Sequence, residues 1–204
     1  MIRAVCSDMD DGFINAAKEV FGDKVKIIID RFHVAKLYRK GLDTLRKAEM
    51  KRLKNTLVKE EYAKLKNVMW ILRKDTKNLL NEELDVLQLL FMHSPLLETS
   101  YKLSKELTYI FNEDRQRSRA KRKIHAWINR VKQSGLGCFN TFLSTLEERM
   151  EEILNYFIHR QTSGFVEGLN NKIKVIKRRC YGILNPDHLF QRILLDLSGY
   201  YLFS

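Results

Sequence analysis

The chain has 204 residues, of which 45% are hydrophobic and 30% are charged, as is typical of a soluble globular protein with one good core or with one domain and a large insertion. Three isolated cysteines argue against structural zinc and a disulfide framework and fit a reducing cytoplasm, and no apolar run is long enough for a membrane span. A net charge of +12 favours an acidic partner, most often nucleic acid, because neutralising phosphates releases counterions.

The first 44 residues predict a strand, a helix and a second strand. Residues 2–7 and 25–29 are short and apolar, and residues 13–21 between them have helical spacing. A unit of this length implies two parallel strands joined by a crossover helix. Asp8 and Asp30 follow the two strands, at the edge where open α/β sheets gather functional groups. Each is equally typical of a turn or capping Asp, although two on adjacent strands favour a site.

Residues 35–157 are nearly all helical in pattern. Residues 36–66 predict one long charged helix, and residues 81–92 predict an amphipathic helix with Asn81 as its N-cap. A further helix opens at Leu96, and residues 134–137 break the chain before the next helix. The five histidines share no spacing and are more typical of packing or surface residues than of metal ligands.

A basic run occupies residues 115–123, with six cations and no acid in nine positions. By itself such a run is more typical of a solvated loop than of a binding patch. In a chain this basic, contact with a DNA backbone is the second option.

Residues 163–179 place one carboxylate ahead of a helix that carries five cations in its last eight positions. At 100° per residue, one face holds Leu169, Ile173, Ile176 and Cys180. The opposite face holds Glu167, Asn171, Lys174 and Arg178. A lone acid heading a stripe of amides and cations suits a metal ion held beside a polyanion. A solvated basic helix whose first-turn Glu favours the helix dipole fits this segment equally well.

Five segments in this order resemble the bacterial insertion-sequence transposases of the ISL3 group: Asp8-Met9, Asp30-Arg31-Phe32-His33-Val34, residues 70–74, residues 153–157 and residues 166–182. The resemblance covers nearly the whole chain, and its second and last motifs are the specific ones. It implies an α/β, ribonuclease-H-like domain, mostly helical overall, that a large all-α insertion interrupts. The expected parts are residues 1–44 (strand–helix–strand), 45–155 (helical insertion) and 156–204 (C-terminal helices with the catalytic Glu).

The family carries an Asp-Asp-Glu triad, and the resemblance implies site residues for this chain. Glu167 matches the final Glu, and Asp8 best matches the second Asp, with Asp30 as the alternative. Asp30 and His33 match an Asp-x-x-His element with a structural or DNA-positioning role. The expected activity is cleavage and strand transfer of DNA with two Mg²⁺ or Mn²⁺ ions, which hard carboxylate oxygens bind. The expected DNA contacts are Asn171, Lys172, Lys174, Lys177, Arg178 and Arg179.

The first triad Asp of the family belongs to a strand upstream of Met1. The chain therefore resembles the C-terminal half of a transposase, inactive alone, whose incomplete ribonuclease-H-like sheet leaves an exposed edge and an apolar face. We expect the carboxyl groups of Asp8 and Glu167 to lie about 4–8 Å apart, with a two-metal site only in the complete domain. Expected partners are transposon ends and target DNA in the bacterial nucleoid, and the chain itself or an intact transposase. The alternative is a non-catalytic remnant that binds DNA or pairs with intact transposase.

Overall fold

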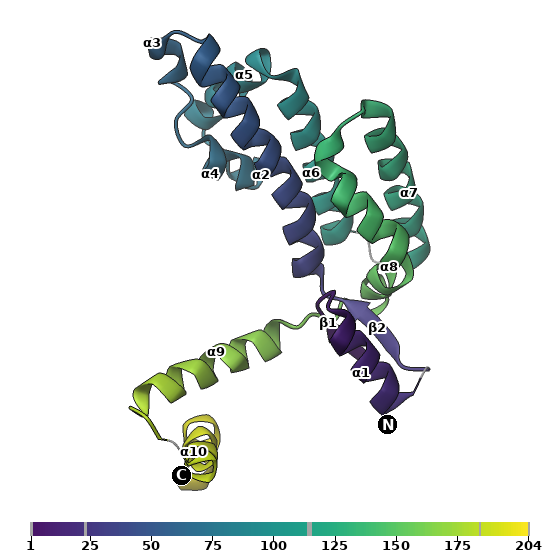
Figure 1. Cartoon of the computed structure of the whole chain (residues 1–204), viewed down its shortest axis with the longest axis vertical. Coiled ribbons are helices and arrows are strands. Elements are labelled where there is room, and N and C mark those ends of the chain that lie inside the picture. Colours follow the sequence, from purple (N-terminus) through teal and green to yellow (C-terminus); the bar gives the residue numbers. More distant parts are fainter. Residues whose placement is uncertain (1, 23, 114–115, 184, 204) are drawn as a thin grey trace. The chain divides into compact units, whose positions relative to one another are not determined.

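The computed structural model of the chain consists of two compact units, residues 1–161 and 162–204 (Figure 1). It describes residues 2–22, 24–113, 116–183 and 185–203, and within these ranges it describes side chains as far as residue 198. The positions of the two units relative to one another are not determined. The elements are β1 (Ala4–Ser7), α1 (Asp11–Phe21), β2 (Lys26–Ile29), α2 (Arg31–Thr56), α3 (Lys59–Tyr62), α4 (Val68–Arg73), η1 (Thr76–Asn78), α5 (Asn81–His93), α6 (Pro95–Glu113), α7 (Arg117–Ser134), η2 (Gly137–Phe139), α8 (Asn140–His159), α9 (Gly164–Arg179) and α10 (Pro186–Phe203). The α/β, mainly helical class is confirmed.

The predicted strand–helix–strand unit is present, and its strands are parallel. β1 pairs with β2 in a register that sets Ser7 opposite Ile29. Helix α1 begins after Asp10, whose carboxylate accepts hydrogen bonds from the backbone N–H groups of Gly12 and Phe13. It ends at Gly22, which has φ +82°, a conformation that glycine adopts without strain.

The first core joins the strands to the helices that follow them. Trp127 of α7 is fully buried, and its indole N–H donates to the Leu103 carbonyl of α6 at 2.9 Å. Asn155 of α8 donates its side-chain amide to the Ile27 carbonyl of β2 at 2.8 Å. That bond satisfies a strand carbonyl that would otherwise lack a ladder partner. The core includes Ile14, Ile28, Ile29, Val34, Tyr38, Leu107, Phe111, Ile124, Trp127, Phe139, Phe142, Ile153, Leu154 and Phe157.

A second core lies at the other end of α2 and α6. These two long helices run through both cores, and α4 and α5 complete the second one. Its buried members are Leu42, Leu53, Leu65, Val68, Ile71, Leu72, Leu87, Leu90, Leu97 and Tyr101. Because α2 crosses residue 44 without a break, the helical part is continuous with the strand–helix–strand part. The three-part organisation expected from the sequence stays a prediction.

Gly41 lies where α2 approaches the turn before α8. A Cβ atom at this position would lie 2.2 Å from the carbonyl oxygen of Cys138. No side chain fits there without a backbone shift, so glycine is required for this close approach despite its low helix propensity.

Two helix boundaries differ from those predicted. The helix expected at residues 36–66 begins at Arg31 instead, because Asp30 caps it, and it ends at Thr56, after which Leu57 turns and packs on the second core. The prediction of Asn81 as an N-cap is wrong. Asn81 is the first helical residue, and the Glu83 carboxylate accepts the N–H of Leu80 at 3.1 Å, which stabilises this helix start from within.

The basic run is helical from Arg117 onward, so the expectation of a loop is wrong for its described part. Arg115 lies outside the described residues. Arg117 and Lys121 both pair with Glu151 of α8, the latter at 3.1 Å. The buried apolar face of α7, with Ala120 and Ile124, stabilises the helix, and the two exposed ion pairs add to it.

In the second unit, α9 packs on α10. Ile176 is buried, and Leu169, Ile173 and Cys180 on the same face are half-buried. The opposite face is exposed, with Glu167, Asn171, Lys174 and Arg178. The predicted division of this helix into a packing face and a polar stripe is therefore confirmed. Within the described residues, no helix is both long and apolar enough to cross a membrane.

Candidate metal centre and nucleic-acid interface

The carboxyl edge of the two strands holds two aspartates. Because Ser7 lies opposite Ile29, the residues that follow them, Asp8 and Asp30, emerge side by side. The backbone N–H of Asp30 donates to the Ser7 carbonyl at 2.8 Å, so the strand pairing extends to the edge itself. The predicted placement of these two acids at the ends of adjacent parallel strands is thus present. Asp8 and Asp30 differ in their burial and in their hydrogen bonds.

Asp8 is half-buried, and only one of its carboxylate oxygens is engaged. Oδ1 accepts hydrogen bonds from the backbone N–H of Asp10 at 3.2 Å and from the Ser7 hydroxyl at 3.4 Å. Within the described residues, Oδ2 has no hydrogen-bond donor. The turn therefore orients the carboxylate and leaves one oxygen available to a cation.

Asp30 is only 2% exposed, and its role in the structure is that of a helix cap. Oδ1 accepts the N–H of Phe32 at 2.6 Å, and Oδ2 lies 4.0 Å from the thiol of Cys6. Burial raises the pKa of the Cys6 thiol to about 11, and the negative charge of Asp30 contributes to the same rise. Asp30 thus caps the start of α2 and contacts Cys6 of β1.

The Cys6 thiol should therefore alkylate slowly at mildly alkaline pH. Thiolate is the reactive form, and a pKa raised from 9.0 to about 11 lowers its fraction by about 100-fold below pH 9. Asp30→Asn should speed the reaction by removing the charge, while Asn still caps the helix. The measurement is iodoacetamide labelling of the Cys6 peptide against pH, followed by mass spectrometry, with the urea-unfolded chain as control. Equal rates in the folded and unfolded chains would contradict this environment for Cys6.

The other acids near this edge have structural partners. Asp10 caps α1, and Asp11 pairs with Arg149 of α8. His33 lies in the first turn of α2, with its ring edge-on to that of Phe32 at 5.7 Å between centroids. Asp10 also accepts its hydrogen bonds through Oδ1 alone, so the feature that sets Asp8 apart is its place directly after β1, beside Asp30.

Glu167 lies in the exposed first turn of α9. The Ser163 hydroxyl donates to its Oε1 at 3.3 Å, and its own backbone N–H donates to the Ser163 carbonyl at 2.9 Å. The carboxylate is thus oriented at the positive end of the helix dipole. Glu167 belongs to the second unit and Asp8 to the first, so the distance expected between them stays a prediction.

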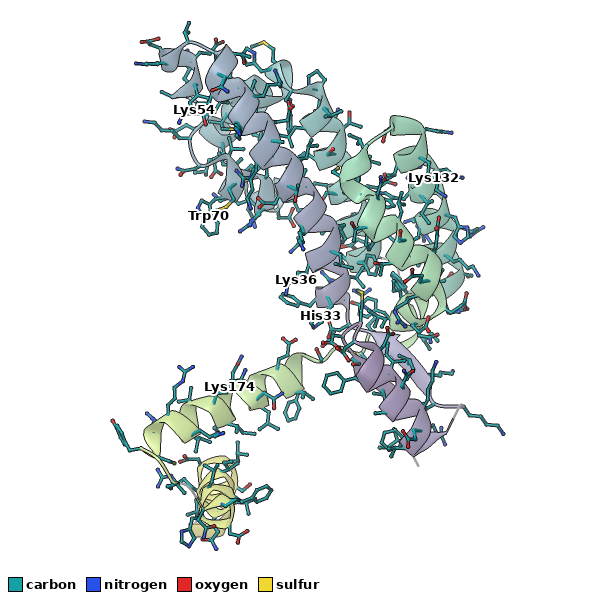
Figure 2. The ribbon with its side chains drawn as sticks, viewed as in Figure 1. His33, Lys36, Lys54, Trp70, Lys132 and Lys174 are labelled. Carbon is teal, nitrogen blue, oxygen red and sulfur yellow. The ribbon has the colours of Figure 1, made fainter. Side chains whose placement is uncertain are left out.

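The six residues expected to contact DNA are all on α9 and all exposed: Asn171, Lys172, Lys174, Lys177, Arg178 and Arg179. Lys174 is labelled on this helix in Figure 2. None of these six residues is an acid, and the five cations among them give this helix a positive charge that a polyanion can contact.

The donor chemistry of Asp8 and Glu167 fits a hard divalent cation. Each carboxylate accepts a hydrogen bond from a nearby residue of its own segment, and carboxylate oxygens are the ligands that Mg²⁺ and Mn²⁺ prefer. The described residues contain no group of three or more His, Cys, Asp or Glu side chains that could hold a metal ion.

The first unit also contains a basic groove that was not predicted from the sequence, which we name the α2 groove. It has a volume of about 740 Å³ and lies between α2, the α4–η1 segment and α6. Its cations are Arg31, Lys36, Arg39, Lys40, Arg46, Arg73, Lys77 and Lys105. The spacing of residues 36, 39 and 40 on one helix face was a readable signal. The approach of residues 77 and 105 depends on tertiary packing and has no local signal.

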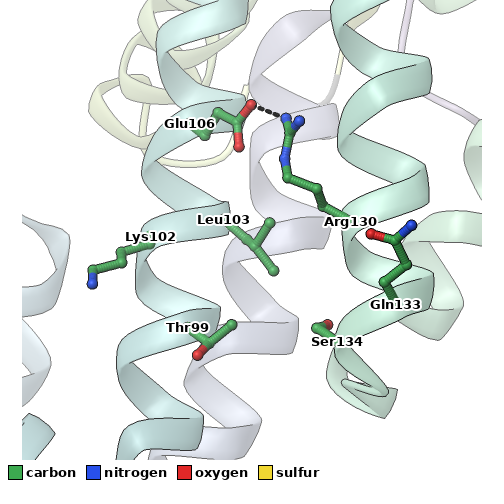
Figure 3. Close-up of a pocket in the computed structure, with 7 residues that line it drawn as sticks. All are labelled: Thr99, Lys102, Leu103, Glu106, Arg130, Gln133 and Ser134. Atoms are coloured by element: carbon green, nitrogen blue, oxygen red, sulfur yellow. Dashed lines mark hydrogen bonds and ion pairs between the residues drawn. The ribbon is translucent and has the colours of Figure 1, made fainter.

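A smaller hollow of about 450 Å³ lies between α6 and α7 (Figure 3). Its two cations are already paired, Arg130 with Glu106 across the hollow and Lys102 with Glu98 at 2.7 Å. This hollow therefore offers little charge to a ligand.

Comparison with known families decides the group to which these features belong. The model of the ISL3-type DDE transposases, a family described as transposase, matches residues 1–193. The chain belongs to this transposase family. The resemblance drawn from its motifs is confirmed.

Individual members of the family give the extent of the likeness. The chain is 31% identical over 200 residues to the transposase for insertion sequence element IS1001 of Bordetella parapertussis, which covers 97% of this chain and 48% of that protein. It is 22% identical over 142 residues to the IS1557 transposase of two Mycobacterium tuberculosis strains, covering 70% of this chain and 32% of that protein. The chain spans about half the length, or less, of these relatives. No solved structure matches it.

Proposed function

We propose that this chain supplies the second Asp and the final Glu of a DDE transposase active site. Asp8 and Glu167 would hold a divalent cation, Mg²⁺ or Mn²⁺, for DNA cleavage and strand transfer of an insertion sequence. The observation that carries this proposal is the parallel register, which brings Asp8 to the carboxyl edge of the strands with one oxygen open. Membership of the family supports the matching role of Glu167.

The residue types suit in-line displacement at phosphorus. A bound divalent cation supplies activation of the attacking oxygen and stabilisation of the leaving oxygen. Asp8 and Glu167 hold that charge in place, and the turn at Asp10 and the hydroxyl of Ser163 orient their carboxylates. Lys174 and Arg178, on the face of Glu167, bind the DNA backbone. Asp30 and His33 position the strand edge and the start of α2 around them.

The apolar surface of the N-terminal unit supports a ribonuclease-H-like sheet with further strands. Within the described residues, β1 pairs only with β2, so one strand edge is open. Ile2 is 52% exposed, Phe13 65% and Val20 71%, although all three are large and apolar. Additional strands would pair with the open edge, and the elements that accompany them would cover these side chains. Self-association or pairing with an intact transposase would cover it in the same way.

The direct test is a cleavage assay on DNA that carries element ends. The 204-residue chain alone should cut nothing with Mg²⁺ or Mn²⁺, since it holds two of the three triad carboxylates. Cleavage should appear when a segment with further strands and the first triad Asp is fused upstream or added as a fragment, a form we name the complemented chain. Cleavage by the 204-residue chain alone would assign the activity to another acid, with Asp10 and Asp30 to be replaced first.

A second candidate function is DNA binding without catalysis. The exposed basic stripe of α9 favours it, because phosphate contacts require cations and no metal. A complemented chain that binds element ends but never cleaves them would favour this function over the first.

A further inference from the structure

The α2 groove carries an excess of positive charge that its own acids do not neutralise. Eight lining residues are Lys or Arg and three are Asp or Glu, so the groove is positive on balance. Of the three acids, Asp43 pairs with Arg46, Lys47 and Arg73, Asp75 accepts the backbone N–H of Lys77 at 3.2 Å, and Glu113 is exposed. The remaining cations therefore face a concave surface with little compensation, which attracts a polyanion.

Three of these cations form a row on one face of α2. Lys36, Arg39 and Lys40 lie at spacings of three and four residues and are exposed, and none has a carboxylate within ion-pair distance in the described part of the chain. Lys105 of α6 forms the facing wall. Burial lowers the pKa of Lys105, the charge of Asp75 raises it, and the charge of Arg39 has a smaller lowering effect.

Aromatic rings stand among the cations. Phe32 is 61% exposed and Tyr109 is 59% exposed, and both line the groove beside the apolar side chains of Leu42, Met69 and Leu72. Lys123 Nζ lies 5.6 Å from the Tyr109 ring centroid, and the exposed remainder of this ring is available for contact with a ligand. A groove that combines backbone-binding cations with stacking rings is typical of sites for single-stranded nucleic acid.

We propose that the α2 groove binds single-stranded DNA. Lys36, Arg39 and Lys40 bind its phosphates, and Phe32 and Tyr109 stack on its unpaired bases. A double helix hides the base faces from such rings, so the rings favour an unpaired strand over a duplex. This site goes beyond the proposed function and depends on neither the metal nor Glu167.

One end of the α2 groove lies next to the strand edge that carries Asp8. Arg31 and Phe32 line the groove and directly follow Asp30, which lies beside Asp8 at the carboxyl ends of the two strands. Figure 2 shows His33 and Lys36 near that end of α2 and Lys54 near the other end. A single DNA strand released near Asp8 would therefore reach the groove within the first unit.

The test is binding of a fluorescent oligothymidine to the full chain, measured by anisotropy over a range of salt. Replacing Lys36, Arg39 and Lys40 by Ala should make the slope of log K against log salt shallower by about two units, because each phosphate contact on a single strand contributes roughly 0.7. The matched control replaces Lys51, Lys54 and Lys64, three exposed cations outside the groove, and should leave the slope unchanged.

Tyr109 separates stacking from charge. Tyr109→Ala should weaken oligothymidine binding by roughly 5- to 150-fold, whereas Tyr109→Phe should bind like the parent chain, because the ring carries the stacking. In a chain whose Lys174 and Arg178 are also replaced by Ala, which removes duplex contacts of α9, a duplex of the same length should compete poorly. Equal slopes for the groove and control variants, undiminished binding by Tyr109→Ala, or equal competition by duplex would each overturn the proposal. None of these outcomes bears on cleavage, which tests the proposed function separately.

Discussion

Replacing Glu167 by Gln should abolish cleavage by the complemented chain, with a loss on the order of 10³-fold or more. Glutamine keeps the shape of glutamate and can still accept the hydrogen bond from Ser163, but it lacks the charge that holds a divalent cation. Stabilisation by the cation is worth several kcal/mol in such reactions, and each 1.36 kcal/mol is a factor of ten in rate. Cleavage of DNA that carries element ends, followed with Mg²⁺ and with Mn²⁺, measures this loss.

Glu82 provides a matched control for that substitution. It is likewise an exposed first-turn glutamate, but it belongs to α5 in the helical part of the first unit. Glu82→Gln should cleave at the parent rate. If Glu167→Gln also retained full activity, the catalytic role would belong to another acid.

Replacing Lys174 and Arg178 by Ala should weaken the salt dependence of duplex DNA binding. Each lost phosphate contact makes the slope of log K against log salt shallower by about 0.9 units on B-DNA, so the pair should change it by roughly 1.8 units. Both side chains are exposed on the face of Glu167, so their removal leaves the packing of α9 on α10 intact. Binding should show little sequence preference throughout, because phosphate contacts carry no sequence information.

Two controls accompany the duplex measurement. Lys174→Arg with Arg178→Lys keeps both charges and should keep the slope, and Lys51→Ala with Lys54→Ala removes two exposed charges from α2 and should also keep it. An unchanged slope in the Lys174 and Arg178 double variant would mean that this stripe does not face DNA.

Local patterns predicted much of this structure. The apolar strands and the helical spacing between them predicted the parallel unit, because each signal lies within the element it determines. The faces of α9 followed from helical spacing alone, with Ile176 buried and Lys174 exposed. Asp8 could be placed at the edge of the sheet because it directly follows the first apolar strand.

Features that depend on contacts between distant segments could not be read from the sequence. Nothing near Asp30 indicates that it is 2% exposed beside Cys6, since that follows from the pairing of two strands. The Glu151 partner of Arg117 and Lys121 comes from a helix 30 or more residues away. The facing wall of the α2 groove, formed by Lys105, depends likewise on the packing of α6 on α2.

The central claim is that Asp8 and Glu167 bind the same metal ion, and iron-directed backbone cutting of the complemented chain tests it most directly. Fe²⁺ binds carboxylate sites at least as well as Mn²⁺, and with ascorbate and peroxide it generates hydroxyl radicals that cut the nearest backbone. We predict cuts near both Asp8 and Glu167, suppressed by excess Mg²⁺, with both cuts lost in Asp8→Asn alone and in Glu167→Gln alone. Cuts near Asp8 that persist unchanged in Glu167→Gln would contradict a shared metal site.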